Sequence, residues 1–303
     1  MAQRVGIALV LLSLGSCGRP ASAFEGKRAF AWLERQCDFG PRVPGTDPHD
    51  SCFAFLTATL RQYTADVQTD TFYYDSPELR HRVRLMNVVA HFRPKLTQRV
   101  LLGAHWDTRP WADQDPVPAK RHLPVLGAND GASGVAVLLE LARLMAGRSQ
   151  PAIGVDIVFF DGEDLGTQEN PSGFFRGSNR YVEQISDQKP PLFVVVLDMI
   201  GKKDLELHWE GNSRKMASNI VDLVWNEARS QSIHSFRSDV RHTIYDDHIP
   251  FLTAGIPAVD LIDFDYPPWH TTHDTPDKCS PESLEGVGKV LISLVTKPNF
   301  LSN

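Results

Sequence analysis

Acidic and histidine side chains stand at the ends of four short apolar runs of this chain. The runs, each followed by the polar residues that it delivers, are "RVLLGAHWD" (Arg99–Asp107; His105 and Asp107), "VDIVFFD" (Val155–Asp161; Asp161, Glu163 and Asp164), "PLFVVVLDMIG" (Pro191–Gly201; Asp198) and "PAVDLID" (Pro257–Asp263; Asp260 and Asp263). Apolar runs almost without alternation are typical of strands buried on both faces of a sheet. The carboxyl ends of such strands form the ligand-binding edge of an open α/β sheet. Carboxylates gathered there would repel one another, so the pattern predicts a metal ion among them.

Three local patterns suggest different roles for the residues around such an ion. In "HWD" the side chains of His105 and Asp107 point the same way from a strand, so Asp107 could orient the His105 ring. Glycines around Asp130 in "GANDGASGV" allow a close approach to a metal, although an N-cap role for this aspartate is the alternative. The neighbouring acids Glu163 and Asp164 could act as one free base and one ligand, or could form a solvated acidic turn.

The stretch "WHTTHDT" (Trp269–Thr275) holds two histidines three residues apart, His270 and His273. On a helix both would share one face and could bind one metal ion. A proline pair precedes the stretch and another proline follows it. Because prolines at these places disfavour a helix, the sequence predicts a loop that drops onto the strand ends.

The elements that must position these residues alternate along the chain. Helices are predicted over Glu25–Arg35, Ser51–Thr64, Gly131–Met145, Met216–Arg229 and Pro281–Leu294, and further strands over Val67–Tyr74 and Val83–Phe92. This alternation indicates an α/β fold with helices on both faces of the sheet. No linker divides the chain, so we expect a single-domain α/β/α sandwich over residues 24–303 with a mixed, mostly parallel central sheet.

Composition excludes one class of partner. The 303 residues suit one large α/β domain or two small ones, and 42% hydrophobic with 22% charged residues is ordinary for a soluble globular protein. The net charge of −6 and the lack of a dense Lys/Arg run argue against nucleic acid as a partner.

The N-terminus predicts export. Arg4 precedes an apolar run from Val5 to Leu14 that is too short to span a bilayer and suits a signal peptide over residues 1–23. "LGSC" resembles a bacterial lipobox, which would make Cys17 a lipidated N-terminus, whereas "ASA" offers ordinary cleavage. We expect a periplasmic protein or a membrane-anchored lipoprotein, with membrane contact only through the lipid.

Three cysteines would remain after such processing. Export permits disulfides. Cys37 and Cys52 could close a loop over a Gly/Pro-rich segment and leave Cys279 as a free thiol. The alternative is that all three are reduced, buried thiols.

The motifs taken together resemble the M28 family of zinc peptidases. More narrowly, they resemble glutaminyl-peptide cyclotransferases (glutaminyl cyclases) of the bacterial type that is similar to the animal enzymes. The stretches that carry the resemblance are "GAHWDTRPWADQD", "GANDGASGVAVLLELAR", "FFDGEDLG", "VVLDMIG", "DDHIPFL" and "WHTTHDTPDKCSPESL". The resemblance covers most of the chain and implies a zinc aminopeptidase-like fold.

The resemblance also implies roles for single residues. It assigns the metal to Asp130, Asp164 and His270, and the general base to Glu163. One zinc ion is usual among the cyclases, where the residue matching Asp198 joins a hydrogen-bond network. The resemblance makes Asp246 the partner of Asp198 in that network. His105 and Asp198 match the positions that hold a second zinc ion in aminopeptidases, so two ions are possible.

The implied substrate pocket departs from the family pattern in two ways. Asp164 stands where animal cyclases have Glu, and no Trp follows the acidic pair. Trp269 is the cyclase-like wall beside the metal histidine. The other expected lining residues are Trp106, Phe174 and Phe175, with Trp111, Asp113 and Asp115 shaping a rim loop.

The function implied is conversion of an N-terminal Gln of peptides or proteins to pyroglutamate with release of ammonia, by a monomer. The first alternative is a two-zinc aminopeptidase that uses His105, Asp130, Asp164, Asp198 and His270 as ligands. Trp269 and "DDHIPFL" favour the cyclase over this alternative. The second is a non-catalytic binding ectodomain, which is disfavoured because such relatives usually lose ligands and none is lost here.

Overall fold

The computed structural model describes residues 24–147, 149–186 and 189–297. The predicted signal peptide over residues 1–23, with Cys17, lies outside the described residues. Within the described residues, no helix has the length and apolar character needed to cross a membrane.

A six-stranded sheet forms the centre of the molecule. Its order is β1 (Val67–Ser76), β2 (His81–Phe92), β4 (Gly154–Phe160), β3 (Arg99–His105), β5 (Val194–Asp198) and β8 (Ala258–Ile262). The last four of these are parallel neighbours, whereas β2 runs antiparallel to both β1 and β4. A separate pair, β6 (Leu207–Trp209) and β7 (Phe236–Val240), forms a small second sheet. The predicted mixed, mostly parallel sheet is therefore confirmed.

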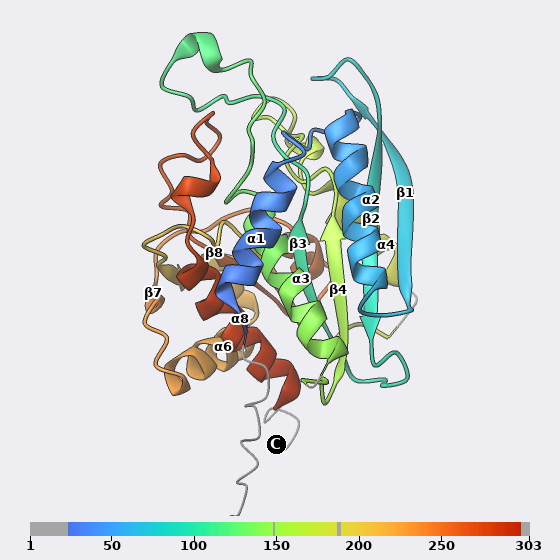
Figure 1. Cartoon of the computed structure of the whole chain (residues 1–303), viewed down its shortest axis with the longest axis vertical. Coiled ribbons are helices and arrows are strands. Elements are labelled where there is room, and N and C mark those ends of the chain that lie inside the picture. Colours follow the sequence, from blue (N-terminus) through green and yellow to red (C-terminus); the bar gives the residue numbers. More distant parts are fainter. Residues whose placement is uncertain (1–23, 148, 187–188, 298–303) are drawn as a thin grey trace, which may run out of the picture.

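Helices cover both faces of the large sheet. They are α1 (Gly26–Cys37), α2 (Asp47–Arg61), α3 (Ala132–Ala146), α4 (Arg176–Ile185), α5 (Gly211–Met216), α6 (Ser218–Ser230), α7 (His248–Thr253) and α8 (Pro281–Thr296). Figure 1 shows α1, α2 and α3 in front of the sheet and α4 behind it. On that far side α4 packs against β2, β4 and α7, and α7 packs against β5 and β8. The α/β/α layering predicted from the sequence is confirmed.

Helix α3 lies between the sheet and the outer helices, which explains its apolar sequence. It contacts β3 and β5 on one side and α1 and α8 on the other, and all but two of its fifteen residues are buried. Gly134 allows this fit, because a Cβ atom there would lie 2.3 Å from the carbonyl oxygen of Leu197 in β5. The backbones of α3 and β5 are thus in direct contact beneath the strand ends.

Several predicted boundaries differ from the structure. The helix expected over Met216–Arg229 is α6, and the short helix α5 that precedes it was not expected. The short helices α4 and α7 were not expected, since α4 is largely polar and α7 is only six residues long. Both matter for function because they flank the cavity described below.

The proposed Cys37–Cys52 disulfide is wrong. All three cysteines of the described residues are free, buried thiols that belong to the main apolar core. Burial raises the pKa of Cys37 to about 11 and that of Cys52 to about 12, so both thiols stay protonated near neutral pH. Helices α1 and α2 are held by apolar packing instead of a covalent bridge.

Candidate active site

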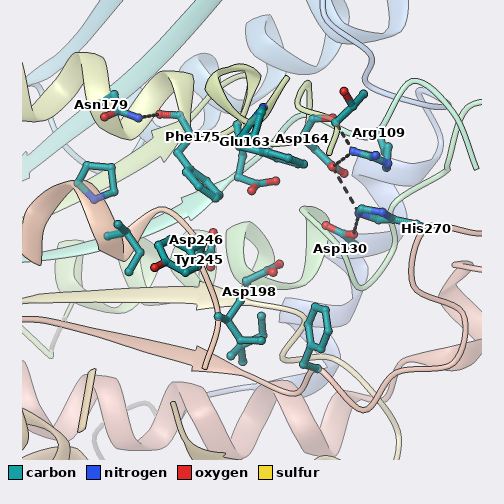
Figure 2. A pocket seen from close by; sticks show the side chains of 18 of the residues that line it. Arg109, Asp130, Glu163, Asp164, Phe175, Asn179, Asp198, Tyr245, Asp246 and His270 are labelled. Atoms are coloured by element: carbon teal, nitrogen blue, oxygen red, sulfur yellow. Dashed lines mark hydrogen bonds and ion pairs between the residues drawn. The ribbon is translucent and has the colours of Figure 1, made fainter. Parts of the chain in front are cut away.

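A cavity of about 1260 Å³ opens beyond the carboxyl ends of the parallel strands. Figure 2 shows acidic side chains and one histidine converging on it from separate loops and strand ends. Its lining includes most of the residues predicted from the sequence: Asp130, Glu163, Asp164, Phe174, Phe175, Asp198, Asp246, Trp269 and His270. Of the residues that the strand-end argument named, Glu163, Asp164 and Asp198 line this cavity.

Asp130, Asp164 and His270 form one buried group of potential metal ligands. A donor atom from each lies within 4.8 Å of the others. Nε2 of His270 is 3.4 Å from Oδ1 of Asp164 and 3.6 Å from Oδ2 of Asp130. Oδ2 of Asp164 is buried without a hydrogen-bond partner among the described residues. Two carboxylates and an imidazole, with an unsatisfied buried oxygen, fit the three-ligand pattern of a catalytic zinc site.

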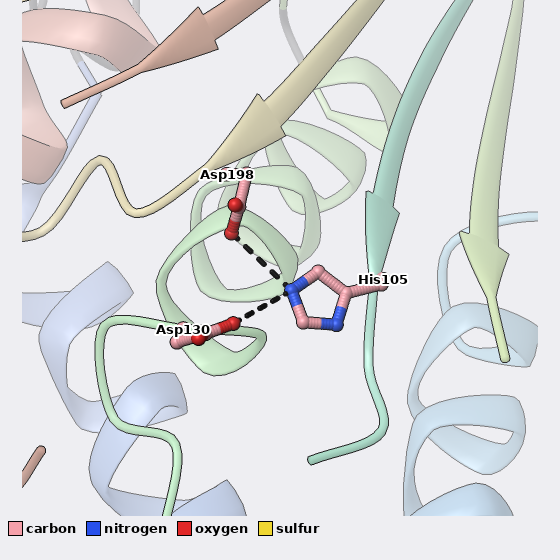
Figure 3. A group of neighbouring side chains, drawn as sticks. All are labelled: His105, Asp130 and Asp198. Atoms are coloured by element: carbon pink, nitrogen blue, oxygen red, sulfur yellow. Dashed lines mark hydrogen bonds and ion pairs between the residues drawn. The ribbon is translucent and has the colours of Figure 1, made fainter. Parts of the chain in front are cut away.

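His105, Asp130 and Asp198 form a second group that shares Asp130 with the first. Figure 3 shows Nε2 of His105 between the two carboxylates, 3.1 Å from Oδ1 of Asp130 and 3.2 Å from Oδ1 of Asp198. One oxygen of Asp130 thus faces His105 and the other faces His270. Burial lowers the pKa of His105, but Asp107, Asp130 and Asp198 outweigh it and raise this pKa well above its usual value.

The loop that presents Asp130 is held by an aspartate whose role the sequence did not reveal. Asp274 accepts hydrogen bonds from the backbone N–H groups of Asn129 at 2.9 Å and of Asp130 at 3.1 Å. The hydroxyl of Tyr266 donates to the same carboxylate at 2.7 Å. Gly131 has φ +97°, and a Cβ atom there would lie 2.6 Å from the carbonyl oxygen of Asp107. No local motif marks Asp274 as a support of this loop, since the two residues that it holds there are 145 and 144 residues away.

Asp107 forms its hydrogen bonds with the turn that carries Glu163 and Asp164. Its two oxygens accept hydrogen bonds from the backbone N–H groups of Glu163 at 3.2 Å and Asp164 at 3.3 Å. Its Oδ1 lies 3.6 Å from Nδ1 of His105, which is longer than a hydrogen bond. The expected orientation of the His105 ring by Asp107 thus stays a prediction.

Arg109 is a second site residue that the sequence did not reveal. Its guanidinium donates to Oδ1 of Asp164 at 2.8 Å and to the two oxygens of Asp113 at 2.7 and 3.0 Å. Oδ1 of Asp113 in turn lies 3.4 Å from Nδ1 of His270. Burial raises the pKa of Asp164, but His270 and Arg109 outweigh it, so this pKa is lowered. His270 and Arg109 together therefore favour the ionised form of Asp164, and the hydrogen bond from Arg109 holds its carboxylate in place.

The loop over Trp269–Thr275 contains no helix, as predicted. The carbonyl oxygen of His270 accepts from the N–H of Gln114, and Asp115 accepts from both the N–H and the hydroxyl of Thr272. These bonds tie the loop to the rim segment near Asp115. His270 points into the site, whereas His273 is exposed and makes no ion pair with a described residue.

Glu163 faces the cavity from beside the metal-ligand group, as Figure 2 shows. Its carboxylate forms no hydrogen bond or ion pair with any described residue. Burial and the charges of Asp164 and Asp246 raise its pKa well above the usual value for glutamate. A carboxylate that is free, enclosed and more basic than usual is suited to accept a proton from a substrate.

Asp198 and Asp246 line the cavity below Glu163 in the view of Figure 2. Burial raises the pKa of both carboxyl groups. Oδ2 of Asp246 is buried without a hydrogen-bond partner among the described residues, while its Oδ1 accepts from the N–H of Asp247. The predicted proton shared between Asp198 and Asp246 stays a prediction.

Aromatic rings form the apolar part of the lining. The ring of Trp269 stacks on that of His270 with centroids 3.8 Å apart and contacts Phe264 at 4.9 Å. Phe174 and Phe175 stack on each other at 5.6 Å and supply a wall where no Trp follows the acidic pair.

Trp106 does not line the pocket, so that prediction is wrong. Its side chain is 0% exposed, donates to the carbonyl oxygen of Met86 at 3.1 Å and stacks on His49 at 4.3 Å. Successive side chains on an extended segment point to opposite faces. Because His105 points toward the site, Trp106 must point into the core.

Comparisons with known proteins agree with this geometry. Residues 87–295 match the model of peptidase family M28. A glutaminyl-peptide cyclotransferase of Gloydius blomhoffii is 28% identical over 258 residues, which cover 74% of this chain and 68% of that protein. The glutaminyl cyclase of Porphyromonas gingivalis is 35% identical, with a TM-score of 0.84 over 90% of this chain and 98% of the other.

Two further solved structures that share this fold are named as a glutaminyl cyclase and as an exopeptidase. The glutaminyl cyclase of Bacteroides thetaiotaomicron is 33% identical, with a TM-score of 0.85 over 91% of this chain and 99% of the other. A Zn-dependent exopeptidase of Parabacteroides distasonis is 32% identical, with a TM-score of 0.87 over the same shares. Since the family model matches most of the chain and these structures align along nearly their whole length, the chain belongs to peptidase family M28.

Proposed function

We propose that the protein is a zinc-dependent glutaminyl cyclase that converts the N-terminal Gln of peptides or proteins to pyroglutamate with release of ammonia. The observation that carries the proposal is the placement of Glu163, unpaired and facing the cavity, beside the group Asp130, Asp164 and His270. Trp269, stacked on His270, supplies the apolar wall for the Gln side chain. The similarity to glutaminyl cyclases of known structure supports this choice.

The residues divide the reaction between them. Asp130, Asp164 and His270 would hold a zinc ion, which would act as a Lewis acid toward the γ-carbonyl of the substrate. Glu163 accepts a proton from the α-amine as the bond between this nitrogen and the γ-carbon forms. Glu163 then donates a proton to the γ-nitrogen, the bond between the γ-carbon and this nitrogen breaks, and ammonia leaves. The nucleophile belongs to the substrate itself, so no water molecule is consumed.

Asp198 and Asp246 have a supporting role in this scheme. Both carboxyl groups line the cavity and have raised pKa values. One proton carried by the pair would let the protonated carboxyl group donate a hydrogen bond to the developing tetrahedral centre, while the other carboxylate accepts one from the amine. This role needs Asp246 to keep its buried Oδ2 free of other partners, as it is in the structure.

A two-zinc aminopeptidase is the second candidate, because of one specific observation. Asp130 directs one oxygen toward His105 and the other toward His270, as a carboxylate that bridges two ions would. In that reaction Glu163 would activate a water molecule instead of a substrate amine.

One assay distinguishes the two activities. Purified protein is offered a Gln-peptide and a leucine anilide, and bound zinc is counted per chain. Ammonia release with about one zinc ion per chain supports the cyclase. Anilide hydrolysis with about two zinc ions, and no cyclisation, would replace the proposal by the aminopeptidase.

We also propose that the protein is exported and acts as a monomer, anchored through lipid on Cys17. Mass spectrometry of the N-terminus of the mature protein tests this: a diacylated Cys17 supports the lipoprotein, and an N-terminus after Ala23 supports ordinary cleavage. Light scattering measures the molar mass in solution and so tests whether the protein is a monomer.

A further inference from the structure

The cavity is much larger than an N-terminal Gln would need. We call the part of it around Asp130, Asp164 and His270 the metal end. Its volume of about 1260 Å³ exceeds the range of about 300–1,000 Å³ that is usual for pockets that enclose a drug-sized ligand. A single glutaminyl residue is smaller than such a ligand. Figure 2 shows where the remaining space lies, with His270 at one end of the lining and Asn179 of α4 at the other.

One face of α4 forms a wall of this outer part. Asn179, Val182 and Glu183 all line the cavity, and their spacing of three and four residues places them on one helix face. Nδ2 of Asn179 donates to the carbonyl oxygen of Phe175 at 2.7 Å, which fixes this amide at the start of the helix.

Helix α7 forms the facing wall. Ile249 and Thr253, one turn apart, line the cavity, and α7 packs against α4. The ring of Tyr245 stands at the opening, lines the cavity and is 72% exposed. We call this outer part, between α4, α7 and Tyr245, the α4–α7 groove.

The length of the groove matches a short peptide. From Phe175, beside Glu163, to Glu183 the chain advances eight helical residues, about 12 Å at 1.5 Å per residue. An extended peptide advances about 3.3 Å per residue. The groove therefore has room for the three residues that follow an N-terminal Gln held at the metal end.

The charge of the groove is negative. Glu183 lines its outer end, and its carboxylate forms no ion pair with a described residue. The nearest arginine on α4, Arg180, is bound to Asp70 at 2.9 Å. Arg109 is the only Lys or Arg among the described residues that line the cavity, and its guanidinium already forms ion pairs with Asp113 and Asp164.

We propose that the α4–α7 groove binds the third and fourth residues of the peptide substrate, and that Glu183 makes it favour Lys or Arg there over Asp or Glu. The apolar side chains of Val182 and Ile249 contact the peptide stem, and Glu183 pairs with the basic head group. This inference rests on the proposed cyclase function and names the class of peptide that the same site takes.

Four peptide amides test the groove in the zinc-loaded protein: Gln-Ala, Gln-Ala-Ala-Ala, Gln-Ala-Ala-Lys and Gln-Ala-Ala-Glu. We expect kcat/KM to rise severalfold from the dipeptide to the neutral tetrapeptide, because the groove is filled. An exposed charge pair contributes modestly, so the Lys peptide should exceed the Glu peptide by about two- to fivefold at low salt. This preference should shrink at high salt because exposed charges are screened.

Variants of Glu183 test whether this side chain causes the preference for Lys over Glu. In Glu183→Gln the preference for Lys over Glu, taken relative to the dipeptide rate of the same variant, should disappear, and in Glu183→Arg it should reverse. Glu34→Gln is the matched control, since Glu34 is an exposed acid on α1 away from the cavity, and it should keep the preference.

The outcomes separate the groove from the proposed function. If the dipeptide is not cyclised, the cyclase proposal fails. Fluorescence anisotropy of the tetrapeptides with a C-terminal dye then still measures the Lys-over-Glu preference in binding. If the dipeptide is cyclised but the tetrapeptides gain nothing, or Glu183→Arg leaves the preference intact, the groove proposal is wrong and the cyclase proposal stands.

Discussion

Arg109 and Asp164 form a buried ion pair, with Nη1 of Arg109 2.8 Å from Oδ1 of Asp164. The pair occupies one oxygen of a predicted metal ligand and leaves the other, Oδ2, without a hydrogen-bond partner in the described part of the chain. A guanidinium that also binds Asp113 through two oxygens fixes both the position and the direction of the Asp164 carboxylate.

The first prediction concerns this ion pair. In Arg109→Met the Asp164 carboxylate loses its fixed partner, so we expect zinc affinity to fall about 10–100-fold, as for other residues that orient metal ligands. Chelator competition measures the affinity. Arg237→Met, which removes an exposed pair with Glu206, is the control and should leave zinc binding unchanged. Unaltered affinity in Arg109→Met would mean that Asp164 is held by its backbone alone.

The second prediction separates Glu163 from the ligands. Glu163→Gln keeps the shape of the side chain but removes its ability to accept a proton. We expect turnover of a Gln-peptide to fall by about 10²–10⁴-fold, while zinc content per chain is retained. Loss of zinc from this variant would show that Glu163 is a ligand and that its assignment as a base is wrong.

The third prediction tests the aspartate beneath the metal loop. Asp274→Ala leaves the buried N–H groups of Asn129 and Asp130 without acceptors, at a cost of about 1–3 kcal/mol each. We expect a lower free energy of unfolding and weaker zinc binding together, because both depend on the same loop. Denaturant unfolding with and without zinc measures the two effects. Full zinc affinity in a destabilised variant would contradict the link between Asp274 and the metal site.

The fourth prediction is a pH dependence of stability. Burial raises the pKa of Glu210, but its ion pair with His248 and the N–H groups of Ser213 and Asn212 outweigh it and lower the pKa to about 2. A lowered carboxylate pKa stabilises the folded protein above the unfolded pKa of 4.5, and this stabilisation is lost as pH falls toward 2.

Glu210→Gln isolates this contribution. The difference in free energy of unfolding between the natural protein and the variant should be about 2–3 kcal/mol larger at pH 6 than at pH 2. Glu206→Gln is the matched control. The pKa of Glu206 is lowered by its pair with Arg237, but this half-exposed pair is screened by solvent, so the variant should show a much smaller change. A difference that does not vary with pH would remove Glu210 as the titrating group.

The sequence predicts the site to the extent that the strands dictate it. Polar residues are disfavoured within a parallel strand that is buried on both faces, so they gather at its ends. The acids after β3, β4 and β5 therefore meet at one edge of the sheet. This reasoning predicts His105, Asp164 and Asp198 at one site. In the structure Asp164 and Asp198 line the cavity, whereas His105 does not line it and contacts Asp130 and Asp198. Likewise the prolines around His270 correctly indicated a loop.

Contacts across long distances in the chain could not be predicted in this way. Asp274 and Arg109 act on residues far away in sequence, and no spacing rule marks them. Trp106 was misplaced in the pocket, since its neighbour His105 points toward the site and adjacent strand residues face apart. Helix α4, which forms the outer wall of the cavity, has too few apolar residues to stand out as a helix.

The contact of Gly134 with the carbonyl oxygen of Leu197 has a consequence for how this scaffold can change. Asp130 precedes α3 and Asp198 ends β5, so the space between these two carboxylates is set by two backbones that touch. Any larger residue at position 134 would wedge the helix from the strand and widen the gap between the ligands. Side chains at the strand ends can be exchanged without moving this frame. A shift between a one-ion and a two-ion chemistry therefore requires no rebuilding of the fold.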